Sequence, residues 1–140
     1  MAANDFLYAS LPSEQDIPCK NTEASTALAA GDVVKLDTTN VISGTQGHIG
    51  VLQGTAAAVP LFGVAMEAIA AGKIGRIRPL GPIVQCVASA SITAGVHVAG
   101  AASGKVAAQT AGQTQLGLAI TAASANNDKV LVMLTGAKNA

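Results

Sequence analysis

The sequence predicts an all-β protein, a small β-barrel or β-sandwich of the β-tulip-like kind with an extended N-terminal arm. Apolar and polar residues alternate in several short segments after residue 30, and turns rich in glycine, asparagine and serine separate these segments. None of the segments has the apolar spacing of a helix. Hydrophobic residues make up 50% of the 140 residues and are mainly Ala and Val. Such small side chains suit closely spaced sheets better than a helix bundle.

The first strands are expected between residues 33 and 78. The segment Val33 to Asp37 alternates, with Val34 and Leu36 on one face and the polar residues Lys35 and Asp37 on the other. The segments Leu61 to Glu67 and Lys73 to Arg78 are separated by a short alanine and glycine turn. We therefore expect them to pair as neighbours.

The remaining strands follow in the second half of the chain. The segment Ile83 to Ala90 is nearly apolar on both faces, which is typical of a central strand. Two hairpins are expected around Gly- and Asn-rich turns. They join Gly95–Ala99 to Lys105–Gln109, and Thr114–Thr121 to Lys129–Leu134.

Parts of the two halves resemble each other. Ala30–Leu36 is similar to Ala94–Val98, and Leu61–Glu67 is similar to Gln115–Thr121. Such self-similarity indicates duplication of a structural unit. We expect a duplicated hairpin unit folded into one barrel or sandwich.

Residues 1–23 differ from the rest and are expected to form an extended arm, which leaves residues 24–140 as the β domain. Pro12 and Pro18 disfavour regular structure around them. The arm nevertheless contains aromatic and aliphatic residues, which disordered tails usually lack. The candidate contact residues of the arm are Phe6, Leu7, Tyr8, Leu11 and Ile17. A disordered tail is the alternative.

Composition excludes several classes of function. Eight basic residues are balanced by eight acidic ones, so no surplus of positive charge is present for nucleic acid or a membrane surface. Trp is absent and only three residues are Phe or Tyr, so base-stacking platforms are not expected. No apolar run is long enough to span a membrane, and residues 1–10 do not resemble a secretory signal.

No constellation of catalytic or metal-binding residues is recognisable, and no cofactor is expected. His48 and His97 are the only histidines and have no second ligand at a suitable spacing. Cys19 and Cys86 form no CxxC pair, and reduced thiols made in a cytoplasm are expected. Cys86 is expected to be a buried apolar residue rather than a nucleophile.

Arg76 and Arg78 are the sharpest polar feature, because their spacing places both on one face of the expected strand. Their guanidinium groups could bind carboxylates of a partner. The alternative is that they lie on a solvated strand face, where isolated charges contribute little.

The order of these elements resembles the capsid cement, or head decoration, proteins of tailed bacteriophages. The motifs that carry the resemblance are Gly31-Asp-Val-Val-Lys-Leu-Asp37, Leu61-Phe-Gly-Val-Ala-Met66, Ile92-Thr-Ala-Gly-Val-His-Val98, Gly104-Lys-Val-Ala-Ala108, Leu116-Gly-Leu-Ala-Ile120 and Lys129-Val-Leu-Val-Met-Leu134. It extends over roughly residues 30–136.

The resemblance implies a non-catalytic virion protein, made in the host cytoplasm, that binds the major capsid protein on the outer surface of the capsid, commonly as a trimer. Neutral charge and the absence of catalytic groups agree with this expectation. Two alternatives remain open at this point. They are another virion β-module, such as a fibre or tail component, and a small-ligand binding barrel.

Overall fold

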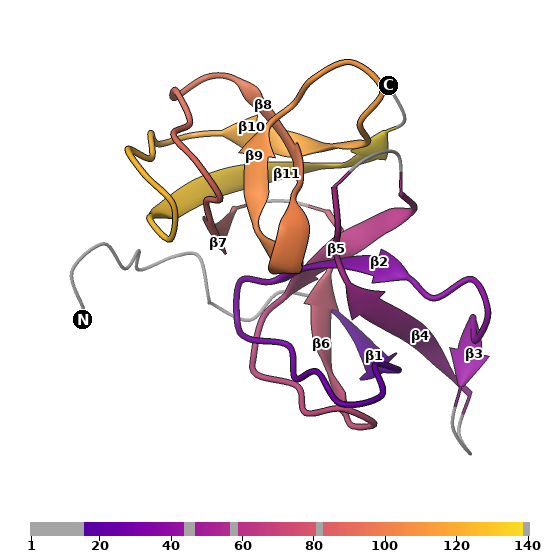
Figure 1. The fold of residues 1–140 in the computed structure, drawn as a ribbon. Helices are drawn as coiled ribbons and strands as arrows, with labels where there is room; N and C mark the ends of the chain where they lie inside the picture. Colours follow the sequence, from indigo (N-terminus) through magenta and orange to yellow (C-terminus); the bar gives the residue numbers. More distant parts are fainter. Residues whose placement is uncertain (1–15, 44–46, 57–58, 81–82, 139–140) are drawn as a thin grey trace.

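The structure of the chain is a computed structural model that describes residues 16–43, 47–56, 59–80 and 83–138. It confirms the all-β prediction. Apart from one 3₁₀ turn, every regular element among these residues is a strand. The strands form two small barrels that follow one another along the chain (Figure 1).

The first barrel contains six strands. They are β1 (Ile17–Asn21), β2 (Val33–Leu36), β3 (Ile42–Ser43), β4 (His48–Gln53), β5 (Leu61–Ala65) and β6 (Ile74–Arg78). Their order is β1-β6-β5-β2-β4-β3, and β1 also pairs with β4 in parallel, which closes the ring. The predicted pairing of residues 61–67 with residues 73–78 is confirmed, because β5 and β6 are antiparallel neighbours.

The second barrel contains five strands and the 3₁₀ turn. They are β7 (Val84–Val87), β8 (His97–Gly100), the 3₁₀ turn Ala102–Gly104, β9 (Val106–Ala108), β10 (Gln115–Ala119) and β11 (Lys129–Lys138). Their order is β7-β11-β10-β8-β9, and a single parallel bridge between Ala88 and Val106 joins the two ends. Both predicted hairpins are present.

The two barrels are repeats of one unit. Strands β1, β6, β5, β2 and β4 correspond in order to β7, β11, β10, β8 and β9. The registers agree residue by residue. The matching pairs are Ile17–Ile77 and Val84–Val132, Val34–Gly63 and Val98–Gly117, and Val64–Arg78 and Leu118–Met133. The similarity between the halves is therefore a duplication of a five-stranded unit, and each copy forms a sheet of its own.

The cores of the barrels differ in one respect. The first barrel has a core made of its own residues, which are Cys19, Leu28, Val34, Val51, Ala65, Ile69 and Ile77. The core of the second barrel also includes Val33, Leu61, Val64 and Met66 from β2, β5 and the residue after β5. The first barrel thus supplies side chains that complete the interior of the second.

Two expectations about individual strands are wrong. The segment around β7 was expected to be central, but β7 lies at the end of its strand order and meets β9 only through the Ala88 bridge. Asp37 was expected on the polar face of its strand, but it is buried. Both Val33 and Val34 are buried, because β2 lies between the two cores.

Asp37 is buried because it organises the turn after β2. It accepts hydrogen bonds from Thr22 Oγ1 at 2.6 Å, from Thr39 N at 3.0 Å, and from Asn40 N and Nδ2 at 3.2 Å each. The Thr22 hydroxyl contributes most to holding the pKa of Asp37 at about 2, below its ordinary value of 3.8. The carboxylate is therefore charged at neutral pH and locks β1 to the start of the β2–β4 hairpin.

Candidate functional site

The two arginines singled out in the sequence lie on β6, at the place where the chain enters the first barrel. Arg76 and Arg78 alternate with Ile77, so both point away from the first core. Strand β1 runs antiparallel to β6 with Ile17 opposite Ile77, which places Asp16 beside the two guanidinium groups.

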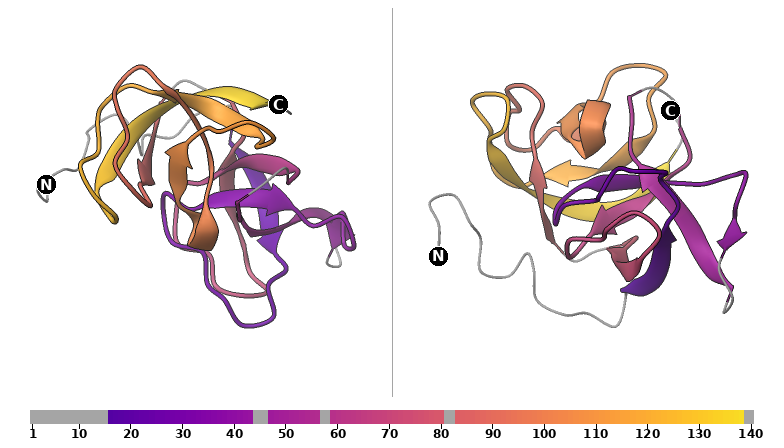
Figure 2. Two further views of the ribbon diagram at one scale, coloured as in Figure 1. Left: turned by 45° about the horizontal axis from the view of Figure 1, so that its top comes forward. Right: turned by 60° about the horizontal axis from the view of Figure 1, so that its bottom comes forward.

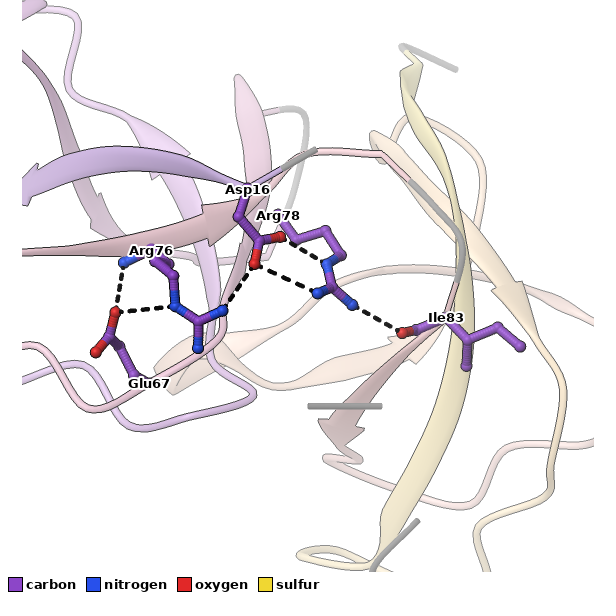
Figure 3. Close-up of polar contacts among 5 residues, drawn as sticks. All are labelled: Asp16, Glu67, Arg76, Arg78 and Ile83. Carbon is purple, nitrogen blue, oxygen red and sulfur yellow. Dashed lines mark hydrogen bonds and ion pairs between the residues drawn. The ribbon is translucent and has the colours of Figure 1, made fainter. Parts of the chain in front are cut away.

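Asp16 binds both arginines (Figure 3). Arg78 Nε and Nη2 donate to Asp16 Oδ1 and Oδ2 at 2.7 and 3.3 Å, and Arg76 Nη1 donates to Oδ2 at 2.9 Å. Arg76 Nε also donates to Glu67 Oε2 at 3.3 Å, and Arg78 Nη1 donates to the carbonyl oxygen of Ile83 at 3.3 Å. The cluster therefore links the start of β1, strand β6 and the residue before β7.

Burial separates these contacts into two kinds. The side chains of Arg78 and Asp16 are 1% and 4% exposed, so their two-bond pair is inside the protein. Removing one member of such a pair leaves an uncompensated buried charge. Arg76 and Glu67 are 37% and 46% exposed, and an ion pair of that kind contributes little. This buried Asp16–Arg78 pair, here called the clamp, thus fixes the residue before β1 to strand β6.

The clamp changes the interpretation of the predicted contact residues. The Arg78 side chain is engaged within its own chain, whereas Arg76 is partly exposed to solvent. Ile17 is half-buried and packs against the first core. Within the segment predicted as the arm, β1 therefore pairs with β6 as a strand of the first barrel. Phe6, Leu7, Tyr8 and Leu11 lie outside the described residues.

The sequence reasoning missed a set of exposed large apolar residues. They are Val41, Ile42, Ile74, Leu80, Ile120 and Met133. Met133 could have been found from the alternation of β11, since Val130, Val132 and Leu134 are buried and Met133 lies on the opposite face. Ile42 lies on the edge strand β3, at the end of the first barrel away from the second (Figure 2).

The two cysteines are buried apolar groups, as the sequence indicated for Cys86. Burial raises the pKa of Cys19 to about 11 and that of Cys86 to about 12, and the charge of Asp32 adds to the shift at Cys86. Both are therefore thiols rather than nucleophilic thiolates at neutral pH. Within the described ranges, no group of three or more His, Cys, Asp or Glu side chains could hold a metal ion, and no helix is long and apolar enough to cross a membrane.

The interiors of both barrels are filled by side chains. Cys19, Val34 and Val51 in the first barrel and Val84 and Val98 in the second are fully buried and belong to continuous cores. Hollows are found at the surface instead, for example beside the turn at residues 122–129 and beside residues 20–23.

Comparison with known proteins identifies the family. A family model described as phage cement protein matches residues 14–134, which extends from before Asp16 of the clamp into β11. The chain belongs to the phage cement protein family. It is a structural protein associated with phage virions, as its resemblance to capsid cement proteins implied.

A solved structure has the same fold as this phage cement protein. It is the N base of head fiber gp8.5 of bacteriophage phi29, with a TM-score of 0.63 and 15% sequence identity. The match covers 88% of the present chain and 95% of the other chain. At this identity the likeness concerns the fold alone. No curated protein matches the sequence.

Proposed function

We propose that this protein binds the outer surface of an assembled phage capsid, through the major capsid protein, and strengthens the shell without catalysis. The observation that carries the proposal is the family match over residues 14–134. The architecture supports it, because two packed barrels held together by a shared core offer a rigid surface for binding.

Association as a homo-oligomer, with a trimer as the expected form, is part of the same proposal. Many copies on a symmetric shell gain affinity from simultaneous contacts that are individually modest. The protein is expected to be made in the host cytoplasm, where both thiols stay reduced.

The test is to mix the purified chain with capsids of its own phage that were assembled without it. We expect sedimentation with the capsid at a fixed, saturable number of copies, and capsids that withstand a higher temperature before they release their contents. Capsids that already carry the protein are the control and should bind no more. Failure to sediment with unoccupied capsids at micromolar concentration would contradict the proposal.

A second candidate function is the base of a head fibre, which the fold of the phi29 head fiber favours. The number and positions of the copies on the virion distinguish a cement protein from a fibre base. A cement protein covers equivalent positions over the whole shell, whereas a fibre base carries a further projecting part at its own sites.

A further inference from the structure

We propose that residues 1–15 of the chain pack, in the free protein, on an apolar outer face of the second barrel. This surface, called the outer β11 face, is formed by side chains of β10, β11, β7 and the residue before β7. Its large apolar members are Ile83, Val87, Leu118, Ile120, Leu131 and Met133. The inference concerns the protein before it meets a capsid, so it goes beyond the proposed function.

The pairing of β10 with β11 forms the centre of the face. Leu118 pairs with Met133, and the amide of Ile120 donates to the carbonyl oxygen of Leu131 at 2.8 Å. The residues that alternate with them on β11 are buried in the core, so these four side chains point outward. They therefore form two adjacent apolar rows on the outside of the barrel.

Ile83 extends the face on the other side of β11. Val84 pairs with Val132, so Ile83, the residue before Val84, lies next to Met133. Val84 and Val132 are both fully buried, and alternation turns Ile83 and Met133 to the outside. The apolar surface is thus continuous across three neighbouring strands.

The same positions are charged in the first barrel. Because Ile17 pairs with Ile77 as Val84 pairs with Val132, the counterparts of Ile83, Val87, Leu131 and Met133 are Asp16, Lys20, Arg76 and Arg78. In the first repeat, ion pairs satisfy this surface. In the second repeat, Ile120 and Met133 are 41% and 38% exposed. A contiguous apolar patch at the surface marks an interaction site.

The chain enters the first barrel beside this face. The guanidinium group of Arg78 binds Asp16 Oδ1 at 2.7 Å and the carbonyl oxygen of Ile83 at 3.3 Å (Figure 3). Ile83 is itself a member of the face. Asp16 therefore lies one guanidinium group away from the edge of the face, and the residues before Asp16 start from this point.

The segment before Asp16 has the length and the side chains to cover the face. Fifteen residues of the sequence precede Asp16, and an extended chain of this length reaches up to about 50 Å. Three neighbouring strands span only about 10 Å. The segment contains two of the three aromatic residues of the chain, and its large apolar residues are Phe6, Leu7, Tyr8 and Leu11. Packing them on the face removes both apolar surfaces from water.

The covalent link favours the chain's own segment over a second copy. A segment tethered at the edge of the face has a high effective concentration there, whereas a second copy must bind from solution. The expected occupant is therefore residues 1–15 of the same chain.

Met133 reports whether the face is covered. Hydrogen peroxide oxidises a methionine side chain to the sulfoxide, and the rate depends on access to the sulfur atom. We compare the free full chain with a chain that lacks residues 2–15 and measure sulfoxide formation at Met133 by peptide mass spectrometry. Met66 is 7% exposed and serves as an internal control for folding.

Two further variants separate the apolar side chains from the mere presence of the segment. The first replaces the four large apolar residues, as Phe6→Ser, Leu7→Ser, Tyr8→Ser and Leu11→Ser. The matched control replaces polar residues of the same segment, as Asn4→Ala, Ser10→Ala and Ser13→Ala. Both variants keep the length of the segment and its attachment at Asp16.

We expect Met133 to be oxidised about threefold faster in the shortened chain and in the serine variant than in the full chain and the alanine control. Oxidation of Met66 should be slow in all four proteins. Protection of Met133 in the full chain should persist after dilution by two orders of magnitude, because the same chain provides it. Threefold protection corresponds to only about 0.6 kcal/mol of docking free energy, so the melting temperature changes little.

Other outcomes overturn the inference. Equal oxidation rates at Met133 in the full and shortened chains do so. Protection that is lost on dilution also does so, and it would assign the face to a second copy. If Met133 is unprotected in the free full chain and becomes protected on capsids, the face contacts the capsid instead. The measurements on the free chain do not depend on capsid binding, so a failure of the proposed function would leave them unchanged.

Discussion

Arg78 shows how a single position can differ between two copies of one unit. Its counterpart in the second barrel is Met133, and the counterpart of Asp16 is Ile83. The first repeat thus has an ion pair where the second has two apolar side chains. Replacing a buried ion pair by apolar residues of similar size is often neutral or stabilising, whereas removing one member is costly.

We therefore predict that Asp16→Ala lowers the free energy of unfolding by about 3–5 kcal/mol, because the Arg78 charge stays buried without its carboxylate. The double variant Asp16→Ile with Arg78→Met, which copies the second repeat, should regain most of this loss. Urea denaturation of the single and double variants measures both values. A double variant no more stable than Asp16→Ala would show that the charges themselves are required.

Asp37 makes the stability of the first barrel dependent on pH in the acid range. Its pKa is lowered to about 2 in the folded protein, so the folded state binds the proton less well than the unfolded chain. The stabilisation is fully present above about pH 4 and is lost as the pH falls towards 2. Asp37→Asn should cost about 1–3 kcal/mol at pH 7, because Thr22 loses a charged acceptor. In urea titrations, the difference in unfolding free energy between Asp37→Asn and the wild type should shrink below pH 3. A difference that stays constant with pH would contradict this explanation.

At the level of elements, two equivalent glycines set how closely strands approach. A Cβ at Gly63 would overlap the carbonyl oxygen of Arg78, and a Cβ at Gly117 would overlap that of Met133. Backbone atoms of a paired strand cannot move aside as the end of a side chain can. We predict that Gly63→Ala and Gly117→Ala each lower the unfolding free energy by at least about 2 kcal/mol.

A glycine in a turn provides the matched control. Gly72 has a positive φ of 78° and Asn127 has 74°, and their amides make equivalent hydrogen bonds to Asn21 and Ala88. Gly72→Asn should therefore change the melting temperature little, since asparagine tolerates this conformation. Equal losses for Gly72→Asn and Gly63→Ala would show that close strand approach is not the cause.

The elements also show what the sequence could predict. Hairpins and the neighbouring pair β5 and β6 were predicted because alternation and turn residues are local signals. Strand β1 was missed because Pro12 and Pro18 favoured an arm. Pro18 is accommodated because it pairs only with β6; the parallel pairing of β1 with β4 begins at Cys19. A proline lacks the backbone N–H that a strand with two neighbours would have to donate. The Asp16–Arg78 pair joins residues 62 positions apart, so no local sequence pattern could predict it.

For the whole molecule, the boundary at Asp16 defines the truncation that tests the arm. Deleting residues 2–15 removes Phe6, Leu7, Tyr8 and Leu11 and keeps the clamp and β1. We predict an almost unchanged melting temperature and capsid binding weakened at least tenfold, which corresponds to about 1.4 kcal/mol. If the shortened chain bound capsids as tightly as the full chain, the attachment surface would lie on the barrels. Arg76 would then be the next residue to replace.

Cys19 and Cys86 can each report the opening of one barrel, because both thiols are buried in the folded protein. They occupy matching places in the two barrels, opposite Gly75 and Val130, and both are fully buried. A thiol reagent reacts with either only when its barrel opens, so Cys86→Ala and Cys19→Ala each leave a reporter for one barrel. Because the first barrel completes the core of the second, its opening must also expose Cys86, whereas Cys19 belongs to a core made only of first-barrel residues. Labelling at neutral pH should therefore be at least as fast at Cys86 as at Cys19, and the reverse order would show that the second barrel holds the first together.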